Sequence, residues 1–454
     1  MATRKDLLKA QTFTHERLVA ALVNRDPDVP QPGLRRLSTG MFVGLLAGVL
    51  ILAGFGVVGL LSKGGVQSWR TDDGELILID TQSGAVFTYR GPDGNRQLRP
   101  AANITSARLL AGPEGKIISL KTASMKGVPI GRMQGIADAP RQLPDPKDMA
   151  TLPIRVCSGA PVNGKRATTL EMAQGAVPNH SASVVLLDDQ GNEYFVLEGR
   201  AHKVVRDAGV VRSPITEGFA PITAGSRFIN ALPQGVEFRP LRIDGFGGQP
   251  NRPVDNRLVG EVVVANQGTS SETYYVVLRD GYSRISYLDA RLLQPDQARI
   301  QTVTSPQLAA ARSSVDRASD QDMPDGKPFP ETGANFDTSS VCATWNGANR
   351  PLLALGVPTP DAVPGSGGAN AADKIVLNQG QGAMIQNDTA LNASAVAYLV
   401  LNGKSYPVPD VASRQSLGYG DVKIVPVPGE VIRLIPAGLP AGVVLDQANA
   451  SKEL

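Results

Sequence analysis

The sequence has few of the residues on which enzymes most often depend. Its 454 residues include two cysteines, three histidines and two tryptophans, and aromatic residues make up only 5 % of the chain. No G-x-S-x-G sequence marks the strained turn of a hydrolase nucleophile, and His180 and His202 are the only histidines beyond residue 62. The sequence therefore favours no catalytic residue and no cofactor, although a pair of hydrolytic carboxylates has no recognisable spacing.

The chain also lacks an excess of one charge. Its net charge is +3, which is too small to indicate a nucleic-acid partner because acidic and basic residues are interspersed. Glycine (48) and proline (34) are more abundant than in an average protein. That composition predicts many short strands and turns rather than long helices.

One long apolar run stands out against this background. Residues 41–61, MFVGLLAGVLILAGFGVVGLL, contain no charge and no proline. As a helix they would extend about 31 Å, the thickness of the hydrocarbon layer of a bilayer. The run is longer than the apolar core of a cleaved signal peptide. We predict a single uncleaved transmembrane helix over 41–61; the alternative is a buried helix of a globular core.

The flanks of this run predict its orientation. Basic residues near a span favour the cytoplasmic side, and residues 1–40 carry seven of them. We therefore expect a cytoplasmic N-terminus, a location in the inner (plasma) membrane, and a periplasmic region from about residue 62 to 454. The seven basic residues are Arg4, Lys5, Lys9, Arg17, Arg25, Arg35 and Arg36.

Three glycines recur every fourth residue at the start of the run: Gly40, Gly44 and Gly48. Small residues at this spacing share one helix face and allow close helix packing in lipid. The alternative is that glycine is simply common in membrane helices. Before the run, residues 3–24 are predicted to form a cytoplasmic helix that begins at a Thr3–Asp6 capping box. This helix is either solvated or docked on a cytoplasmic partner.

Four segments of the periplasmic region share one pattern, an apolar strand, a glycine-containing turn and a second strand. A short helix-like piece follows three of them. We interpret them as four copies of a small hairpin-plus-helix unit, and chance similarity among hairpins is the alternative. The segments are 75–89, 193–205, 274–286 and 397–408, and the helix-like pieces are 103–112, 287–294 and 410–420.

The cysteines, Cys157 and Cys342, both lie in the region predicted to be exported. When a protein in an oxidising compartment has only two cysteines, these most often form a disulfide. Two buried free thiols, or part of a metal site without the usual neighbouring ligands, are the alternatives.

The segment closest to a nucleotide-binding loop is GAPVNGKR, Gly159–Arg166. A P-loop needs G-x-x-x-x-G-K followed by Ser or Thr, whose hydroxyl binds magnesium. The segment has both glycines and Lys165, but Arg166 replaces the hydroxyl and Pro161 lacks a backbone N–H. We predict a surface turn here rather than an ATP site.

Taken together, these segments resemble the EccB family, the membrane component of mycobacterial type VII (ESX) secretion systems. The resemblance covers essentially the whole chain and depends on the order of several elements. They are QTFTHERLVAALVNRD before the apolar run, IRVCSG (154–159), VCATW (341–345), and LGYG, VPVPG and LIPAGLPAG near the C-terminus.

The resemblance implies an α+β protein in which one transmembrane helix precedes an elongated, β-rich region of four repeats around a central domain, tied by one disulfide. We accordingly expect residues 1–40 to be a cytoplasmic helix and linker and 41–61 the membrane helix. Residues 62–150 would hold the first repeat and a connection, 151–394 the central domain with the second and third repeats, and 395–454 the fourth repeat and a C-terminal tail.

The resemblance also implies a function and partners. The chain would be a structural core component that links a cytoplasmic motor to the periplasmic assembly. Its partners would be the EccC ATPase, EccD, EccE, the mycosin protease and further copies of itself. The family is often labelled ATPase, so ATP hydrolysis is one alternative function. A membrane-anchored module that binds peptidoglycan or another envelope glycan is the other.

Overall fold

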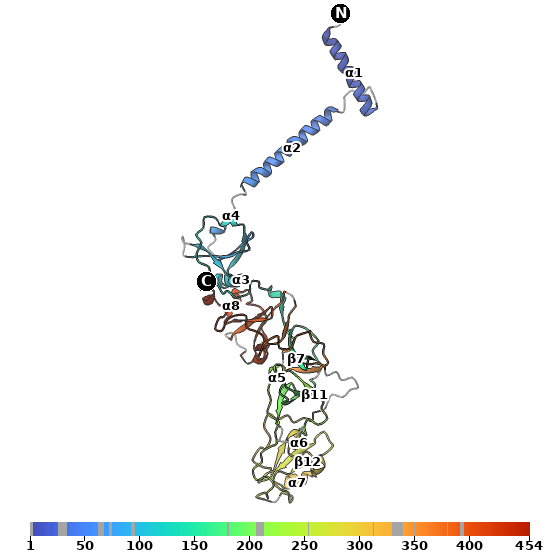
Figure 1. Cartoon of the computed structure of the whole chain (residues 1–454), viewed down its shortest axis with the longest axis vertical. Coiled ribbons are helices and arrows are strands. Elements are labelled where there is room, and N and C mark those ends of the chain that lie inside the picture. Colours follow the sequence, from blue (N-terminus) through green and yellow to red (C-terminus); the bar gives the residue numbers. More distant parts are fainter. Residues whose placement is uncertain are drawn as a thin grey trace. The chain divides into compact units, whose positions relative to one another are not determined.

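The computed structural model describes most of the chain (Figure 1). Its contacts divide the chain into two compact units. The first comprises Met1–Asp73, Ile79–Gly84 and Ser119–Val128, and the second comprises Gly74–Leu78, Ala85–Ile118 and Pro129–Leu454. The described residues are 3–25, 34–61, 68–71, 75–91, 96–178, 181–205, 213–252, 254–311, 313–328, 339–347, 350–378, 380–390 and 395–454.

Two helices open the chain. Helix α1 (Arg4–Asn24) begins at the predicted capping box, where the Asp6 carboxylate accepts hydrogen bonds from the backbone N–H and the hydroxyl of Thr3. Helix α2 (Leu34–Leu61) includes the whole apolar run. Its side chains are described at 39–55 and 57, and the large apolar ones among them, such as Leu52 and Phe55, are exposed. Among the described residues, no helix has the length and apolarity of a membrane span.

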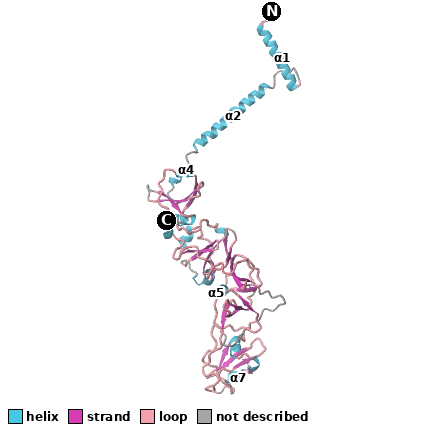
Figure 2. Ribbon diagram, viewed as in Figure 1, coloured by secondary structure: helices cyan, strands magenta, loops and turns pink. Residues whose placement is uncertain are grey.

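Four sheets with one strand order follow among the described residues, and Figure 2 draws their strands in magenta. Three have four strands, and the last has a fifth because β5 (Met149–Ala150) also pairs with β19. With β5 set aside, the strand that comes first along the chain in each sheet lies between the second and the fourth, and the third lies outside the second. The strands are β1 (Leu76–Asp80), β2 (Val86–Arg90), β3 (Gln97–Ala101) and β4 (Lys116–Leu120); β8 (Val184–Leu187), β9 (Glu193–Leu197), β10 (Arg200–Val204) and β11 (Pro221–Thr223); β12 (Val262–Ala265), β13 (Thr273–Val277), β14 (Tyr282–Ile285) and β15 (Gln301–Val303); and β19 (Gly382–Asn387), β20 (Ala397–Leu401), β21 (Lys404–Val408) and β22 (Val425–Val427).

We call each of these sheets with its helices a repeat. The second and third strands of each repeat pair antiparallel. In the second and fourth repeats a two-residue turn joins them, such as Asn402–Gly403, where both residues have positive φ as a type I′ turn requires. The fourth strand pairs parallel with the first in the last three repeats, so the chain must cross over before it. In the first, third and fourth repeats a helix makes this crossover: α3 (Ile104–Ala111), α6 (Tyr287–Leu293) and α8 (Val411–Ser416).

The crossover helices begin at matching caps. The side chains of Asn103, Ser286 and Asp410 each accept a hydrogen bond from the backbone N–H three residues on, which satisfies a donor that the first helical turn leaves free. A second helix follows the fourth strand of each repeat: α4 (Thr122–Met125), α5 (Ser226–Ala231), α7 (Ser305–Ala310) and α9 (Gly429–Ile432).

One predicted hairpin differs from the others in its place within the repeat. Segment 75–89 contains the first and second strands, β1 and β2, whereas the other three segments contain the second and third. The strand that corresponds in the first repeat, β3, reads QLRPA. Its proline and polar residues hide its strand character from a reading of the sequence.

A fifth sheet forms the centre, in the order β17-β16-β6-β7-β18. Strands β6 and β16 pair antiparallel, and Cys157 lies directly opposite Cys342. The two cysteines form a disulfide across this pair. The second and third repeats lie between them in sequence, so the disulfide closes the base of that part of the chain. The strands are β6 (Ile154–Val162), β7 (Lys165–Met172), β16 (Val341–Trp345), β17 (Leu352–Leu355) and β18 (Lys374–Val376).

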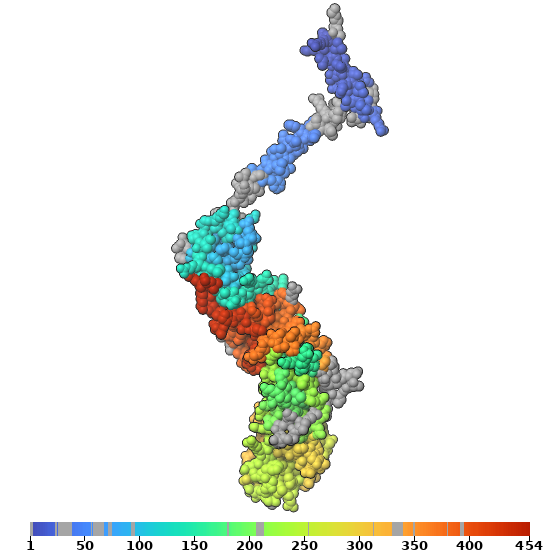
Figure 3. All heavy atoms as spheres, viewed as in Figure 1, coloured from blue at the N-terminus to red at the C-terminus, as the bar shows by residue number. Residues whose placement is uncertain are grey.

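Buried side chains show which repeats pack together. Leu109 and Leu110 of the first repeat share a core with Tyr419 and Leu445 of the fourth, as the adjoining blue-green and red regions of Figure 3 illustrate. The central sheet shares a core with the second and fourth repeats. The third repeat contacts the second through Leu288 and Leu292. Repeats that are distant in sequence are therefore neighbours in the fold.

The remaining elements are short. They are 3₁₀ turns at Ser68–Thr71, Pro146–Asp148, Gln297–Arg299 and Asp388–Ala390, strand β5 (Met149–Ala150), which pairs with β19, and helix α10 (Gln447–Ala450). The predicted α+β class with many small sheets is confirmed. The predicted domain limits stay predictions, and β19 lies on the N-terminal side of the limit set at residue 395.

Candidate functional site

The segment that resembles a P-loop is a β-hairpin. Val162 pairs with Lys165 across a two-residue turn, Asn163–Gly164, and both turn residues have positive φ. A P-loop instead connects a strand to a helix whose first N–H groups face the phosphates. The Arg166 side chain donates to the carbonyl oxygens of Gly159 and Ser339. This local geometry is that of the surface turn predicted from the sequence.

The other residues singled out by the sequence each have their own local environment. Gly40, Gly44 and Gly48 are in α2, where an added Cβ would meet no atom within 4 Å, so their role in helix packing stays a prediction. His180 is outside the described residues. His202 is buried in β10.

His202 has a structural environment. Its ring stacks on Phe238 at a centroid distance of 4.3 Å, and its Nδ1 lies 2.9 Å from the carbonyl oxygen of Val236. Burial lowers the pKa of the imidazole, which favours the neutral ring. The ring also covers Gly235, where a Cβ would overlap it.

This packing belongs to a feature that recurs in every repeat. After its last helix, each repeat continues as an extended stretch along the outer edge of the third strand, which we call the closing segment. Isolated parallel bridges mark it: Leu98 with Ile130, Ala201 with Gln234, Tyr282 with Ser313, and Ser405 with Ala437. The residue after each bridge donates its N–H to the third strand in all four repeats, from Gly131, Gly235, Ser314 and Gly438.

In three repeats this donor is the glycine of a Pro-x-Gly sequence, and a large side chain of the third strand lies against it. Arg99 faces Gly131, His202 faces Gly235 and Tyr406 faces Gly438. A Cβ at Gly235 or Gly438 would overlap the ring, and one at Gly131 would lie 3.1 Å from Gln97 Cδ and 3.3 Å from Arg99 Cγ. The absence of a side chain on the glycine therefore allows the close packing.

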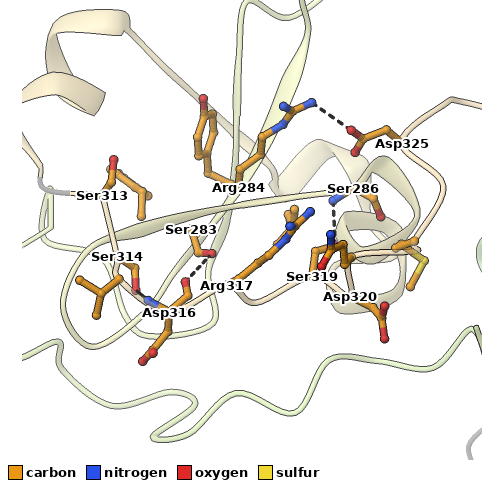
Figure 4. Close-up of a pocket in the computed structure, with 16 residues that line it drawn as sticks. Ser283, Arg284, Ser286, Ser313, Ser314, Asp316, Arg317, Ser319, Asp320 and Asp325 are labelled. Atoms are coloured by element: carbon orange, nitrogen blue, oxygen red, sulfur yellow. Dashed lines mark hydrogen bonds and ion pairs between the residues drawn. The ribbon is translucent and has the colours of Figure 1, made fainter.

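The third repeat differs at both positions of this pair. Serines occupy them, Ser283 on β14 and Ser314 on the closing segment. The Ser283 hydroxyl donates to the Asp316 carbonyl oxygen at 3.0 Å and accepts from Ala318 N at 3.1 Å. A cavity of about 380 Å³ lies beside these residues, within the roughly 300–1,000 Å³ typical of ligand sites. We take this cavity as the candidate functional site (Figure 4).

Both signs of charge surround the cavity. At its rim, Arg284 Nη2 lies 3.1 Å from Asp325 Oδ2. Figure 4 shows the Arg317 side chain extending between Ser283 and Ser286. Within the described part of the chain, the Arg317 guanidinium and the Asp316 carboxylate have no hydrogen-bond or ion-pair partner. The site can therefore accept a group that carries charge of either sign.

A buried carboxyl group fixes the closing segment beside the cavity. Asp289, fully buried in α6, accepts hydrogen bonds from the hydroxyls of Ser286 and Ser319. Burial raises the pKa of Asp289. In the first repeat, Asn103 Nδ2 donates to the Ile136 carbonyl oxygen and Ser106 Oγ accepts from Ile136 N. In both repeats the start of the crossover helix thus holds the closing segment. A carboxyl group does so in the third repeat, and an amide and a hydroxyl do so in the first.

No motif in the sequence predicts this site. Its signal is the place of a motif, because Pro-x-Gly follows soon after the second helix at 129–131, 233–235 and 436–438, whereas in the third repeat it first occurs at 324–326, beyond Ser313 and Ser314. That pattern is visible only when the repeats are aligned by their strands.

Comparisons with known proteins agree over the whole chain. Residues 1–454 match the family described as "Type VII secretion system ESX-1, transport TM domain B". The chain is 25 % identical over 461 residues to the ESX-1 secretion system ATPase EccB1 of Mycobacterium tuberculosis, covering 96 % of this chain and 92 % of that protein. It is 27 % identical over 475 residues to the ESX-3 secretion system ATPase EccB3 of Mycolicibacterium smegmatis, covering 94 % and 86 %.

Two solved structures show the same fold. A chain in the intact ESX-5 inner membrane complex has a TM-score of 0.60 at 20 % identity, covering 100 % of this chain and 96 % of that one. A chain of the EccB3 dimer from the ESX-3 core complex also has a TM-score of 0.60, at 21 % identity, covering 83 % and 99 %.

Proposed function

This chain belongs to the EccB family of type VII secretion systems, and we propose that it is a structural core component of such a membrane complex. In this proposal it links a cytoplasmic motor to a periplasmic assembly. The observation that carries it is the full-length match, because the family model includes the N-terminal helices as well as the repeats. Proposed partners are the EccC ATPase, EccD, EccE, the mycosin protease and a second copy of the chain.

The apolar run in α2 supports a single-pass anchor with a cytoplasmic N-terminus. Exposed leucine, isoleucine, valine and phenylalanine side chains on one helix are costly in water and stable in lipid. A reporter that is active only in the cytoplasm should work when fused before Gly33 and fail when fused after Gly65. Activity at both positions would contradict the anchor and with it the elongated periplasmic arrangement.

Helix α1 supports contact with a cytoplasmic partner. It exposes large apolar side chains at Leu7, Leu8, Phe13, Leu18 and Leu22, a pattern more typical of a docked helix than of a solvated one. Deletion of residues 3–24 should release the motor from the purified complex while the periplasmic region stays folded. Retention of the motor after this deletion would remove α1 from the link.

ATP hydrolysis, the activity in the relatives' names, is the second candidate function. The hairpin at Asn163–Gly164 argues against the P-loop-like segment as its site. Lys165→Ala should therefore leave protein export unchanged, measured as secreted substrate in the culture filtrate. Lost export from a variant that still assembles would restore a nucleotide site there.

An envelope-binding module would behave differently from a scaffold. Its periplasmic region would keep its activity after separation from the anchor, whereas a link between two compartments would not. Residues 65–454, exported as a soluble protein into cells that lack the full chain, should fail to restore secretion. Restored secretion would overturn the scaffold function.

A further inference from the structure

We propose that the cavity of the third repeat binds a polypeptide segment of another subunit, in which an acidic side chain pairs with Arg317 and a basic one with Asp316. This inference rests on the proposed scaffold function and specifies one of its contact sites. In the other three repeats Arg99, His202 or Tyr406 lies against a glycine at the corresponding position, which distinguishes the third repeat from them.

The charges at the cavity select the class of ligand. Arg317 presents a guanidinium without a partner among the described residues, and a carboxylate is its best bidentate match. The Asp316 carboxylate likewise has no hydrogen-bond or ion-pair partner among the described residues. A uniformly anionic polymer, such as a nucleic acid or an anionic lipid surface, would meet Asp316, Asp320 and Asp325 at the rim. A neutral glycan would desolvate these charges without pairing them.

A protein surface carries both signs within a few ångströms and can satisfy both groups at once. The hydroxyls at the cavity add little selectivity, because most already donate within the repeat. Ser283 donates to Asp316 O, Ser314 to Asp280 and Ser319 to Asp289. The ligand is therefore recognised mainly by Arg317 and Asp316.

The position of Val315 offers a direct test. This residue lies in the cavity lining between Ser314 and Asp316, and it is 91 % exposed. A photoreactive amino acid at 315, in the full chain within intact cells, should cross-link to one polypeptide of the complex. Mass spectrometry of the adduct identifies the partner and its segment, and it distinguishes a second copy of this chain from another subunit.

Three variants of the full chain test the chemistry of the contact. Arg317→Glu should reduce the cross-linked product about tenfold or more, since it places like charges opposite each other. Arg299→Glu is the matched control: Arg299 is 74 % exposed on the same repeat, pairs with Asp296 at 3.2 Å and does not line the cavity. Its cross-linking should equal that of the unaltered chain.

The third variant closes the cavity with the chemistry of the fourth repeat. Ser283→Tyr combined with Ser314→Gly recreates the Tyr406–Gly438 pair, and it should abolish cross-linking while the thermal unfolding midpoint stays within a few degrees. In the partner, replacement of the acidic residue at the mapped contact with lysine should restore the cross-linking that Arg317→Glu loses.

Three results would overturn the inference. They are the absence of any polypeptide adduct at 315, unchanged cross-linking in the filled or charge-reversed variant, and an adduct to glycan or lipid alone. If any one of these results is obtained while deletion of residues 3–24 still releases the motor, the cavity assignment fails and the scaffold function stands. Restored secretion by residues 65–454 alone would instead contradict the scaffold function.

Discussion

The third and fourth repeats have the same strand order but differ where the closing segment meets the third strand. In the fourth, Tyr406 packs against Gly438; in the third, Ser283 and Ser314 leave a cavity of about 380 Å³. The backbone contact is the same, because Gly438 N and Ser314 N each donate at 2.8 Å to the third strand. The same main-chain hydrogen bond therefore holds the closing segment in both repeats, and the two side chains beside it can differ between repeats.

The two repeats also differ in what surrounds them. The fourth shares its core with the first repeat and with the central sheet. The third has two clusters whose members all come from residues 241–318, and it contacts the second repeat through one face of α6. We expect the third repeat to respond to perturbation more independently than the fourth, and four changes test this comparison.

Removal of the disulfide should have the largest effect. Cys157 and Cys342 close a loop of 185 residues that contains the third repeat and excludes the fourth. In the chain-entropy model such a loop contributes about 5 kcal/mol to the free energy of unfolding. Cys157→Ser with Cys342→Ser should lower amide-exchange protection in 262–303 more than in 397–427. Equal losses in both segments would show that the repeats are not independent.

Truncation of the packed ring comes next. Tyr406 is 7 % exposed, and Tyr406→Ser would open a cavity in the fourth repeat like that of the third. Large-to-small changes at buried aromatic positions cost about 3 kcal/mol, and urea unfolding of the full chain measures the cost. Ser283→Ala in the third repeat is the control, with a smaller expected loss. A similar loss from both would mean that Ser283 is as important to packing as Tyr406.

Addition of a side chain at Gly438 should have an intermediate effect on the free energy of unfolding. Gly438→Ser gives the fourth repeat the residue of the third, but the new Cβ overlaps the Tyr406 ring. Overpacking of this kind costs about 2 kcal/mol. Combined with Tyr406→Ser, the same substitution should cost less than the sum of the two single changes. Simple additivity in this double-mutant cycle would argue against direct packing of the pair.

The smallest expected effect is on pH dependence. Burial raises the pKa of Asp289 above its unfolded value, so its contribution is most favourable below the unfolded pKa and is lost as pH rises through the folded pKa. Asp289→Asn should remove that part of the pH dependence and change stability by about 1 kcal/mol. The corresponding residue of the fourth repeat, Ser413, does not titrate, so Ser413→Ala should leave the pH profile unchanged. An unaltered profile in Asp289→Asn would show that another group titrates.

Much of the fold followed from local sequence signals. Apolar runs separated by glycine turns marked the second and third strands of three repeats, since a strand alternates its faces and a tight turn needs positive φ. The capping box at Thr3 and Asp6 marked the start of α1. The first strands β8, β12 and β19 are not part of the predicted hairpins, although each pairs antiparallel with the second strand as well as parallel with the fourth. Strand β3 was missed because its proline is atypical of strands.

The sequence by itself determined the class of the protein, its family, the apolar run and the two cysteines available for a disulfide. These depend on residue type and order alone. Only the tertiary structure decided that Cys157 faces Cys342, that the first repeat packs on the fourth, and that Ser283 meets Ser314. Each of these contacts joins residues far apart in the chain or on separate elements. Such contacts arise from the packing of whole sheets, which no short stretch of sequence records.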